Sequence, residues 1–269
     1  RERSLQLLMR INLLKRIESS VDSFRITIDN ILLQIKNTLT AISKGENEIY
    51  SGIQASANSE ELDWEADWGD EENIIGNKVK VRINDMDVLR WNEDLTADLD
   101  TLQQLYNDVK VITPDKDLKL QSLKDKIADK INTPLNPGNK KVIIFTAFAD
   151  TANYLYKNLK DYLSADFEIN TALITGSKRY STAKNISTDL NTLLTCFSPL
   201  SKSKELIFPN LKESIDVIIA TDCISEGQNL QDCDYLINYD IHWNPVRIIQ
   251  RFGRIDRIGS INSNITMVN

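Results

Sequence analysis

The residues best suited to bind a charged substrate lie in the segment 244–260, which holds four arginines. They are Arg247, Arg251, Arg254 and Arg257. None has an Asp or Glu three or four residues away, and three of their spacings set like charge against like, at a cost of a few tenths of a kcal/mol each. A helix that accepts this repulsion is suited to an anion from outside, and planar guanidinium groups suit phosphate. The alternative is a solvated face whose long side chains cover apolar surface.

The element that must position these arginines is a predicted helix over residues 244–257. Asn244 is suited to cap it, and Pro245 to occupy its first turn, where a missing N–H is tolerated. The predicted apolar stripe consists of Ile248, Phe252 and Ile255. The opposite face carries Gln250, Arg254 and Arg257.

Strands and helices alternate through the C-terminal half of the chain. We expect strands at 141–146, 169–175, 215–221, 235–239 and 265–268, and helices at 151–163 and 181–196 before the arginine helix. Residues 197–213 are interpreted as a surface insertion. The pattern predicts an α/β fold with a doubly wound parallel sheet, in which ligands collect beyond the carboxyl ends of the strands. Those ends carry Thr146, Thr175, Gly176, Ser177, Thr221 and Asp222.

The N-terminal half is predicted to be helical. Residues 1–45 form one long amphipathic helix, and a second amphipathic pattern over 88–109 would pair with it as an antiparallel hairpin, here called the helical arm. Residues 46–86 are an acidic insertion, partly disordered, whose segment 46–72 holds ten Asp or Glu and no Lys or Arg. That segment is either solvated or docks on a basic surface.

A further helix at 115–132 leads toward the alternating half. Pro134, Pro137 and Gly138 then mark a turn. The predicted division is therefore 87–138 for the helices that complete the arm, and 139–269 for the α/β lobe.

Composition narrows the function classes. The 269 residues, 41% apolar, suffice for one large domain or two small ones. Residues 1–138 hold 18 Lys and Arg against 25 Asp and Glu, whereas the remainder is balanced, so a nucleic-acid site would be local. Three cysteines without a C-x-x-C pair favour a reducing, cytoplasmic compartment and no metal site. The single histidine, His242, disfavours Ser–His or Cys–His catalysis, and no membrane partner is expected.

The order of the C-terminal motifs resembles the second lobe of superfamily-two helicases of Swi/Snf-like, bacterial type. Residues 250–259 (QRFGRIDRIG) resemble motif VI, and 220–230 (ATDCISEGQNL) resemble motif V. Residues 141–148 resemble motif IV, 175–177 the glycine motif that follows it, and 238–245 the lead into motif VI. Ser260 departs from the family, which usually has Gln there.

The resemblance implies a RecA-like lobe that shares ATP with an upstream lobe. Arg254 and Arg257 would be catalytic, reaching the γ-phosphate as arginine fingers. Gln250, Gly227, Glu226 and Asp222 would contact the nucleotide. Nucleic-acid backbone would be held by Thr146, Thr175, Gly176, Ser177, Thr221, Trp243 and Asn244. No glycine is followed by lysine, so the phosphate loop and the Mg²⁺ site are expected on the upstream lobe, before Arg1.

The resemblance thus predicts an ATP-dependent nucleic-acid translocase lobe, with DNA favoured over RNA, that is inactive alone. Two alternatives stay open: a non-catalytic module that recruits a protein partner through the helical arm, and a strand-separating DNA or RNA helicase. A small-molecule enzyme is disfavoured by the missing glycine-rich fingerprint.

Overall fold

The computed structural model describes residues 2–44, 49–51, 80–82, 87–224, 228–241 and 244–269. The chain divides into two compact units, Arg1–Thr113 and Pro114–Asn269. The sequence placed this division near residue 138, whereas the structure places it at 113/114. The reason is that Leu120, Leu123, Ile127 and Ile131, on the helix that follows Pro114, are all buried in the core of the second unit.

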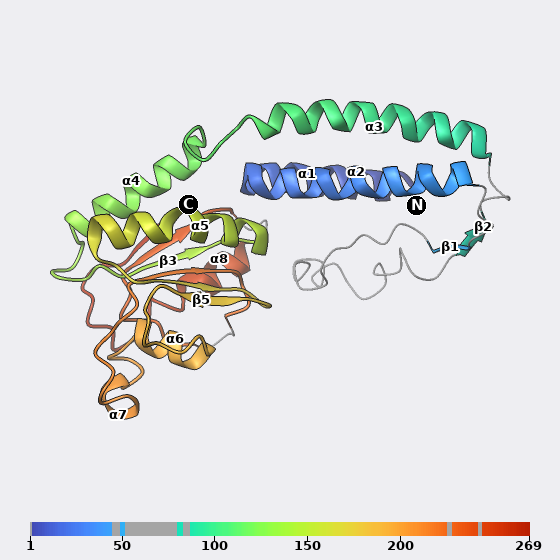
Figure 1. The fold of residues 1–269 in the computed structure, drawn as a ribbon. Helices are drawn as coiled ribbons and strands as arrows, with labels where there is room; N and C mark the ends of the chain where they lie inside the picture. The colour runs from blue at the N-terminus through green and yellow to red at the C-terminus, as the bar shows by residue number, and fades with distance from the viewer. Residues whose placement is uncertain (1, 45–48, 52–79, 83–86, 225–227, 242–243) are drawn as a thin grey trace. The chain divides into compact units, whose positions relative to one another are not determined.

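The described residues of the first unit form the helices α1 (Glu2–Ser19), α2 (Val21–Lys44) and α3 (Val88–Lys110). The expected single helix over 1–45 is wrong, because the chain leaves helical structure at Ser20. The Ser20 hydroxyl accepts a hydrogen bond from the Ser23 amide at 3.1 Å, as an N-cap does. The helix α2 contacts both α1 and α3. In the view of Figure 1, the ribbons of α1 and α2 overlap. The 88–109 helix was expected to pair with the N-terminal helix, and α3 contacts α2.

Two short strands, β1 (Ile49–Ser51) and β2 (Lys80–Arg82), pair antiparallel within the predicted acidic insertion. Residues 52–79, with most of the acidic segment, lie outside the described residues.

The second unit is built on a six-stranded sheet in the order β5-β4-β6-β3-β7-β8. The strands are β3 (Val142–Phe145), β4 (Thr171–Ile174), β5 (Arg179–Ser181), β6 (Val217–Ala220), β7 (Tyr235–Asn238) and β8 (Thr266–Val268). All neighbouring pairs are parallel except β4 and β5. The edge strand β5 was not expected.

Helices cover both faces of this sheet, so the predicted doubly wound α/β fold is confirmed. The helices α4 (Leu118–Asn132) and α5 (Ala149–Phe167) pack on the face that carries Val142 and Ile144. The opposite face, with Ile143 and Phe145, packs on α6 (Leu190–Phe197) and on residues that follow α8 (Pro245–Phe252). Strand residues alternate between the two cores, as the pleat requires.

Two expected elements are shifted. The helix predicted at 181–196 begins only at Leu190, because the Asp189 carboxylate caps it by accepting from the Thr192 amide at 3.2 Å. The predicted surface insertion contains a short helix, α7 (Lys204–Ile207).

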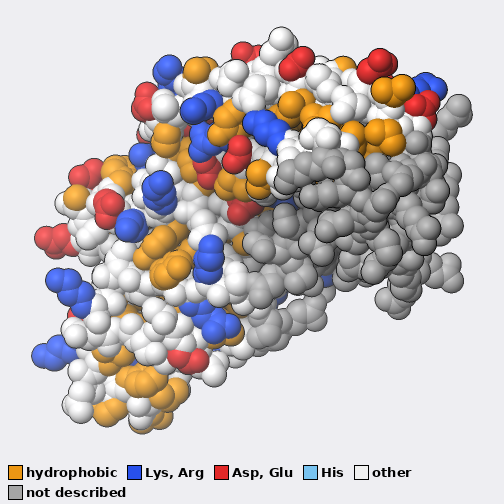
Figure 2. Space-filling model, turned by 45° about the vertical axis from the view of Figure 1, so that its right-hand side comes forward, with side chains coloured by type: hydrophobic (Ala, Val, Ile, Leu, Met, Phe, Trp, Pro, Cys, Tyr) orange, Lys and Arg blue, Asp and Glu red, His pale blue; other side chains and the backbone are white. Residues whose placement is uncertain are grey.

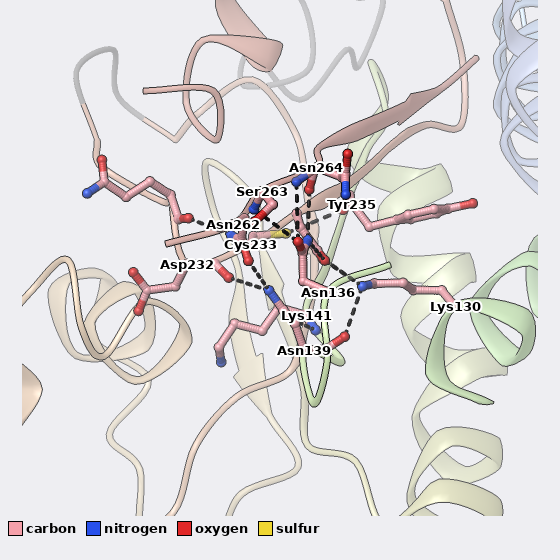
Figure 3. Close-up of polar contacts among 12 residues, drawn as sticks. Lys130, Asn136, Asn139, Lys141, Asp232, Cys233, Tyr235, Asn262, Ser263 and Asn264 are labelled. Atoms are coloured by element: carbon pink, nitrogen blue, oxygen red, sulfur yellow. Dashed lines mark hydrogen bonds and ion pairs between the residues drawn. The ribbon is translucent and has the colours of Figure 1, made fainter. Parts of the chain in front are cut away.

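A buried polar network fixes the amino-terminal edge of the sheet (Figure 3). The Lys130 ammonium lies 2.7 and 2.8 Å from the two carboxylate oxygens of Asp234, and both side chains are almost fully buried. The Asn136 amide donates to Asp234 (2.7 Å) and to the Asn264 carbonyl (2.8 Å), while its oxygen accepts from the Ser263 amide (3.0 Å). The network ties α4 to the starts of β7 and β8, at the edge opposite the one described next.

Candidate functional site

The carboxyl ends of β3, β4, β6 and β7 meet at one edge of the sheet. The residues directly beyond these strands are Thr146, Thr175, Thr221 and Tyr239, and α8 follows β7. This edge gathers all the strand-end residues that the sequence singled out, and it is the candidate site.

The helix α8 begins as predicted and ends early. The Asn244 side chain accepts a hydrogen bond from the Val246 amide at 2.9 Å, and Pro245 occupies the first turn. The expected helix over 244–257 is wrong beyond Phe252, because Gly253, a poor helix former, follows and a turn begins. The Ile255 amide donates to the Phe252 carbonyl, which places Ile255 fully inside the core. Phe252 and Ile255 of the predicted apolar stripe therefore pack on the core, through a turn rather than a continuous helix, whereas Ile248 is half-buried.

Arg251 anchors this segment to the sheet. Its Nε and Nη2 donate to the two carboxylate oxygens of Asp222, each at 2.7 Å. Its Nη1 donates to the Asn238 side-chain oxygen at 2.9 Å, and the guanidinium carbon lies 5.2 Å from the centroid of the Phe145 ring. One fully buried guanidinium thus joins the ends of β6, β7 and β3.

The sequence did not assign Arg251 a role. It grouped the arginines by helical spacing, and the partner Asp222 lies 29 residues earlier in the chain. Asp222, predicted to contact the nucleotide, has both carboxylate oxygens engaged by Arg251.

Thr146 is also engaged inside the protein. Its hydroxyl is fully buried and donates to Asp240 Oδ2 at 2.6 Å, and Asp240 Oδ1 accepts from the Ala147 amide at 2.6 Å. The sequence predicted Thr146 as a nucleic-acid contact and missed Asp240 as its partner. Asp240 follows the end of β7, which is the only signal that could have found it.

The predicted glycine motif forms the tip of the β4–β5 hairpin. Thr175 is buried, and its hydroxyl donates to the Lys178 carbonyl (3.1 Å) and accepts from the Lys178 amide (2.9 Å), so it shapes the turn. Gly176 and Ser177 are exposed at the tip. Thr221 is half-buried on the neighbouring strand end, where its amide donates to the Ile174 carbonyl at 3.2 Å.

The pKa of the Cys223 thiol reflects its surroundings beyond the end of β6. Burial raises the pKa of its thiol, while a hydrogen bond with Thr221 and the positive charge of Arg179 act in the opposite direction. Arg179 on β5 pairs with Ile174, and the Ile174 carbonyl lies 3.6 Å from the Cys223 Sγ.

The two predicted finger arginines differ in their surroundings. The Arg254 side chain is 5% exposed, and its carbonyl accepts from the Leu230 amide at 3.0 Å. Arg257 is half-buried, and its guanidinium donates to the Gly253 carbonyl at 3.0 Å and to the Asn229 side-chain oxygen. Both of these acceptors are neutral, so neither of the two hydrogen bonds neutralises the positive charge of Arg257. This donor set fits an anionic phosphate group such as those of ATP.

The remaining predicted residues divide into two groups. Gln250 is half-buried on α8, next to the anchored Arg251. Glu226, Gly227, His242 and Trp243 lie outside the described residues.

Two kinds of feature are absent from the described residues. Within the ranges given above, no group of His, Cys, Asp or Glu side chains could hold a metal ion. Among the same residues, no helix has the length and apolar character to span a bilayer.

Comparison with known proteins places the chain among helicase sequences. The model of the helicase conserved C-terminal domain matches residues 119–259. An uncharacterized ATP-dependent helicase, YqhH of Bacillus subtilis, is 58% identical over 45 residues, or 17% of this chain and 8% of the relative. A putative ATP-dependent DNA helicase, fml2 of Schizosaccharomyces pombe, is 29% identical over 161 residues, or 58% of this chain and 18% of the relative.

A third relative and one solved structure were also matched. The RNA polymerase-associated protein RapA of Pectobacterium carotovorum is 40% identical over 52 residues, or 19% of this chain and 5% of the relative. The crystal structure of the C-terminal part of the Fun30 ATPase domain aligns with a TM-score of 0.37 and 18% identity, over 56% of this chain and 39% of that one. The chain thus spans at most 18% of the length of these curated relatives.

Proposed function

Since the chain belongs to the helicase conserved C-terminal domain family, we propose that it supplies the second RecA-like lobe of an ATP-dependent nucleic-acid translocase of Swi/Snf-like type. The resemblance to the second lobe of superfamily-two helicases is confirmed by the family match. Closure of this lobe on ATP, and opening after hydrolysis, would move the protein along a duplex. Double-stranded DNA is the proposed substrate.

The observation that carries this proposal is the pairing of Arg251 with Asp222. It fixes the segment 253–257 at the carboxyl edge of the sheet, where the two described hydrogen-bond acceptors of Arg257 are both neutral. In the proposed mechanism Arg254 and Arg257 stabilise the charge that develops on the γ-phosphate, and Gln250, Glu226 and Gly227 help to enclose the nucleotide. Such an arginine typically contributes about 10³–10⁵-fold in rate. ATP, when bound, supplies the phosphoryl group, while the phosphate loop and Mg²⁺ belong to the upstream lobe.

Nucleic acid would be held at the hairpin tip and the neighbouring strand ends. Gly176 and Ser177 are exposed there and offer backbone amides to phosphate oxygens, which requires no sequence-specific contact. Thr221, Trp243 and Asn244 complete the proposed contact. Thr146 and Thr175 support it by shaping the strand ends, since their hydroxyls are engaged internally.

The test is ATP hydrolysis by the full-length protein with and without duplex DNA. Arg254→Ala and Arg257→Ala should each lower the stimulated turnover number by about 10³-fold or more, with ATP binding largely retained. Arg247→Ala is the matched control, because Arg247 lies in the same segment and is proposed for no contact. Wild-type turnover in the Arg254 and Arg257 variants would refute their assignment as arginine fingers. Stimulation of turnover by RNA but not by DNA would refute the proposal that the substrate is DNA.

A further inference from the structure

The edge strand β5 brings exposed cations and a tyrosine beside the predicted nucleic-acid contacts. Lys178 and Arg179 follow the exposed tip formed by Gly176 and Ser177, and all four are exposed. Tyr180 is 48% exposed. None of these three larger side chains was predicted to contact nucleic acid.

The chain holds this edge strand in place through an aromatic pair. The Tyr180 ring stacks on the Tyr156 ring of α5, with centroids 6.1 Å apart and the ring planes 22° from parallel. The Lys160 ammonium, one turn farther along α5, lies 5.9 Å from the centroid of the Tyr156 ring. The Tyr156–Tyr180 pair therefore fixes β5 against α5. Lys160 is a third cation next to the hairpin.

The strand register places the cations on both sides of the hairpin. Tyr180 pairs with Leu173, which faces α5, whereas Arg179 pairs with Ile174, which faces α6. Arg179 accordingly acts on the pKa of Cys223, on the strand end beyond β6. Positive charge thus continues from the carboxyl edge of the sheet, around the hairpin tip, to α5. Figure 2 shows blue Lys and Arg side chains beside orange ones on the surface of the second unit, in the lower part of the picture.

We propose that Lys160, Lys178 and Arg179 bind the phosphodiester backbone of the nucleic acid next to the strand-end site. Together with Tyr180, which positions the hairpin, they are here called the hairpin-edge surface. The inference rests on the proposed function and deepens it, because it adds a contact that the motifs do not include. Lysine and arginine neutralise backbone phosphates without reading sequence. The stacked tyrosines position the hairpin, so that its two cations stay in register with the exposed tip.

The test is nucleic-acid affinity of the full-length protein as a function of salt concentration. Each lost phosphate contact lowers the slope of log K against log salt by about 0.9 for duplex DNA. Lys178→Ala combined with Arg179→Ala should therefore lower the slope by about 2 and the affinity at low salt by tenfold or more. The stimulated ATPase at saturating DNA should change little, because the hairpin-edge surface does not touch the nucleotide.

Two further variants separate charge from folding. Lys140→Ala combined with Lys212→Ala removes two exposed cations that precede β3 and β6, and should leave the slope unchanged. Tyr180→Phe keeps the ring stack and should retain wild-type affinity, whereas Tyr180→Ala should weaken binding.

The outcomes distinguish this inference from the proposed function. Suppose that wild-type protein binds DNA and hydrolyses ATP but the Lys178/Arg179 variant keeps the full salt slope. The hairpin-edge surface then does not bind nucleic acid, and the proposed function stands. An equal loss of slope in the Lys140/Lys212 control would also overturn the inference. If wild-type protein binds no nucleic acid, both proposals fall.

Discussion

Arg251 and Asp222 form a two-bond ion pair that holds the last arginine-rich segment against the end of β6, with both hydrogen bonds at 2.7 Å. The two partners are not equally buried: the Arg251 side chain is 1% exposed and that of Asp222 16%. An isolated buried charge is much more costly than a buried pair. The positions of Arg254 and Arg257 therefore depend on Asp222, which follows the end of β6.

The first prediction concerns the asymmetry of this pair. Asp222→Asn leaves the guanidinium buried without its countercharge and should lower the free energy of unfolding by about 3–5 kcal/mol. Arg251→Met leaves the more exposed carboxylate and should cost less. Urea unfolding of the 1–269 chain, followed by circular dichroism, measures both. Asp256→Asn, exposed in the same segment, is the control and should be near wild type. Equal losses in the two pair variants would contradict the asymmetry.

The second prediction concerns the polar network at the opposite edge of the sheet (Figure 3). Asn136→Ala removes two donated and two accepted hydrogen bonds and should destabilise the chain by about 2–5 kcal/mol. Asn132→Ala, exposed at the end of α4, should cost less than about 0.5 kcal/mol. Thermal unfolding of the two variants checks this, and similar melting temperatures would show that the network does not secure the β7 and β8 starts.

The third prediction concerns pH. Burial raises the pKa of the Cys233 thiol from 9.0 to about 12. A group whose pKa is raised in the folded state contributes stability that is fully present below its unfolded pKa and is lost as pH rises toward the folded value. The free energy of unfolding should therefore fall between about pH 9 and 12. Cys233→Ala should reduce that fall by up to about 1.4 kcal/mol per pH unit, the contribution of one proton. Urea unfolding at several pH values measures this for both proteins. If the thiol plays no part, the free energy of unfolding will fall equally steeply with pH in the wild type and in Cys233→Ala.

The sequence predicted the strands and helix caps that depend on nearby residues. Short aliphatic runs such as 142–145 and 217–220 became buried central strands, since a parallel sheet covered on both faces needs continuous apolar residues. Asn244 caps α8 as expected because capping is a local hydrogen bond. The gathering of strand-end residues at one edge followed from the parallel arrangement alone.

What the sequence could not predict depended on distant partners or on competing local preferences. Ser20 interrupts the N-terminal helix although the apolar spacing continues through it, because its hydroxyl caps α2. The edge strand β5 is three residues long, too short for a periodic signal. Thr146 and Thr175 were expected to face nucleic acid, and which partner engages each hydroxyl became visible only in the folded structure.

The most direct test of the central claim, that this chain is one half of an ATPase site, is DNA-stimulated ATP turnover by residues 1–269 alone and by the full-length protein. The account predicts no turnover above background for residues 1–269. It predicts clear turnover for the full-length protein, and its loss in the Arg257→Ala variant. Stimulated hydrolysis by residues 1–269 alone, or undiminished hydrolysis by full-length Arg257→Ala, would contradict it.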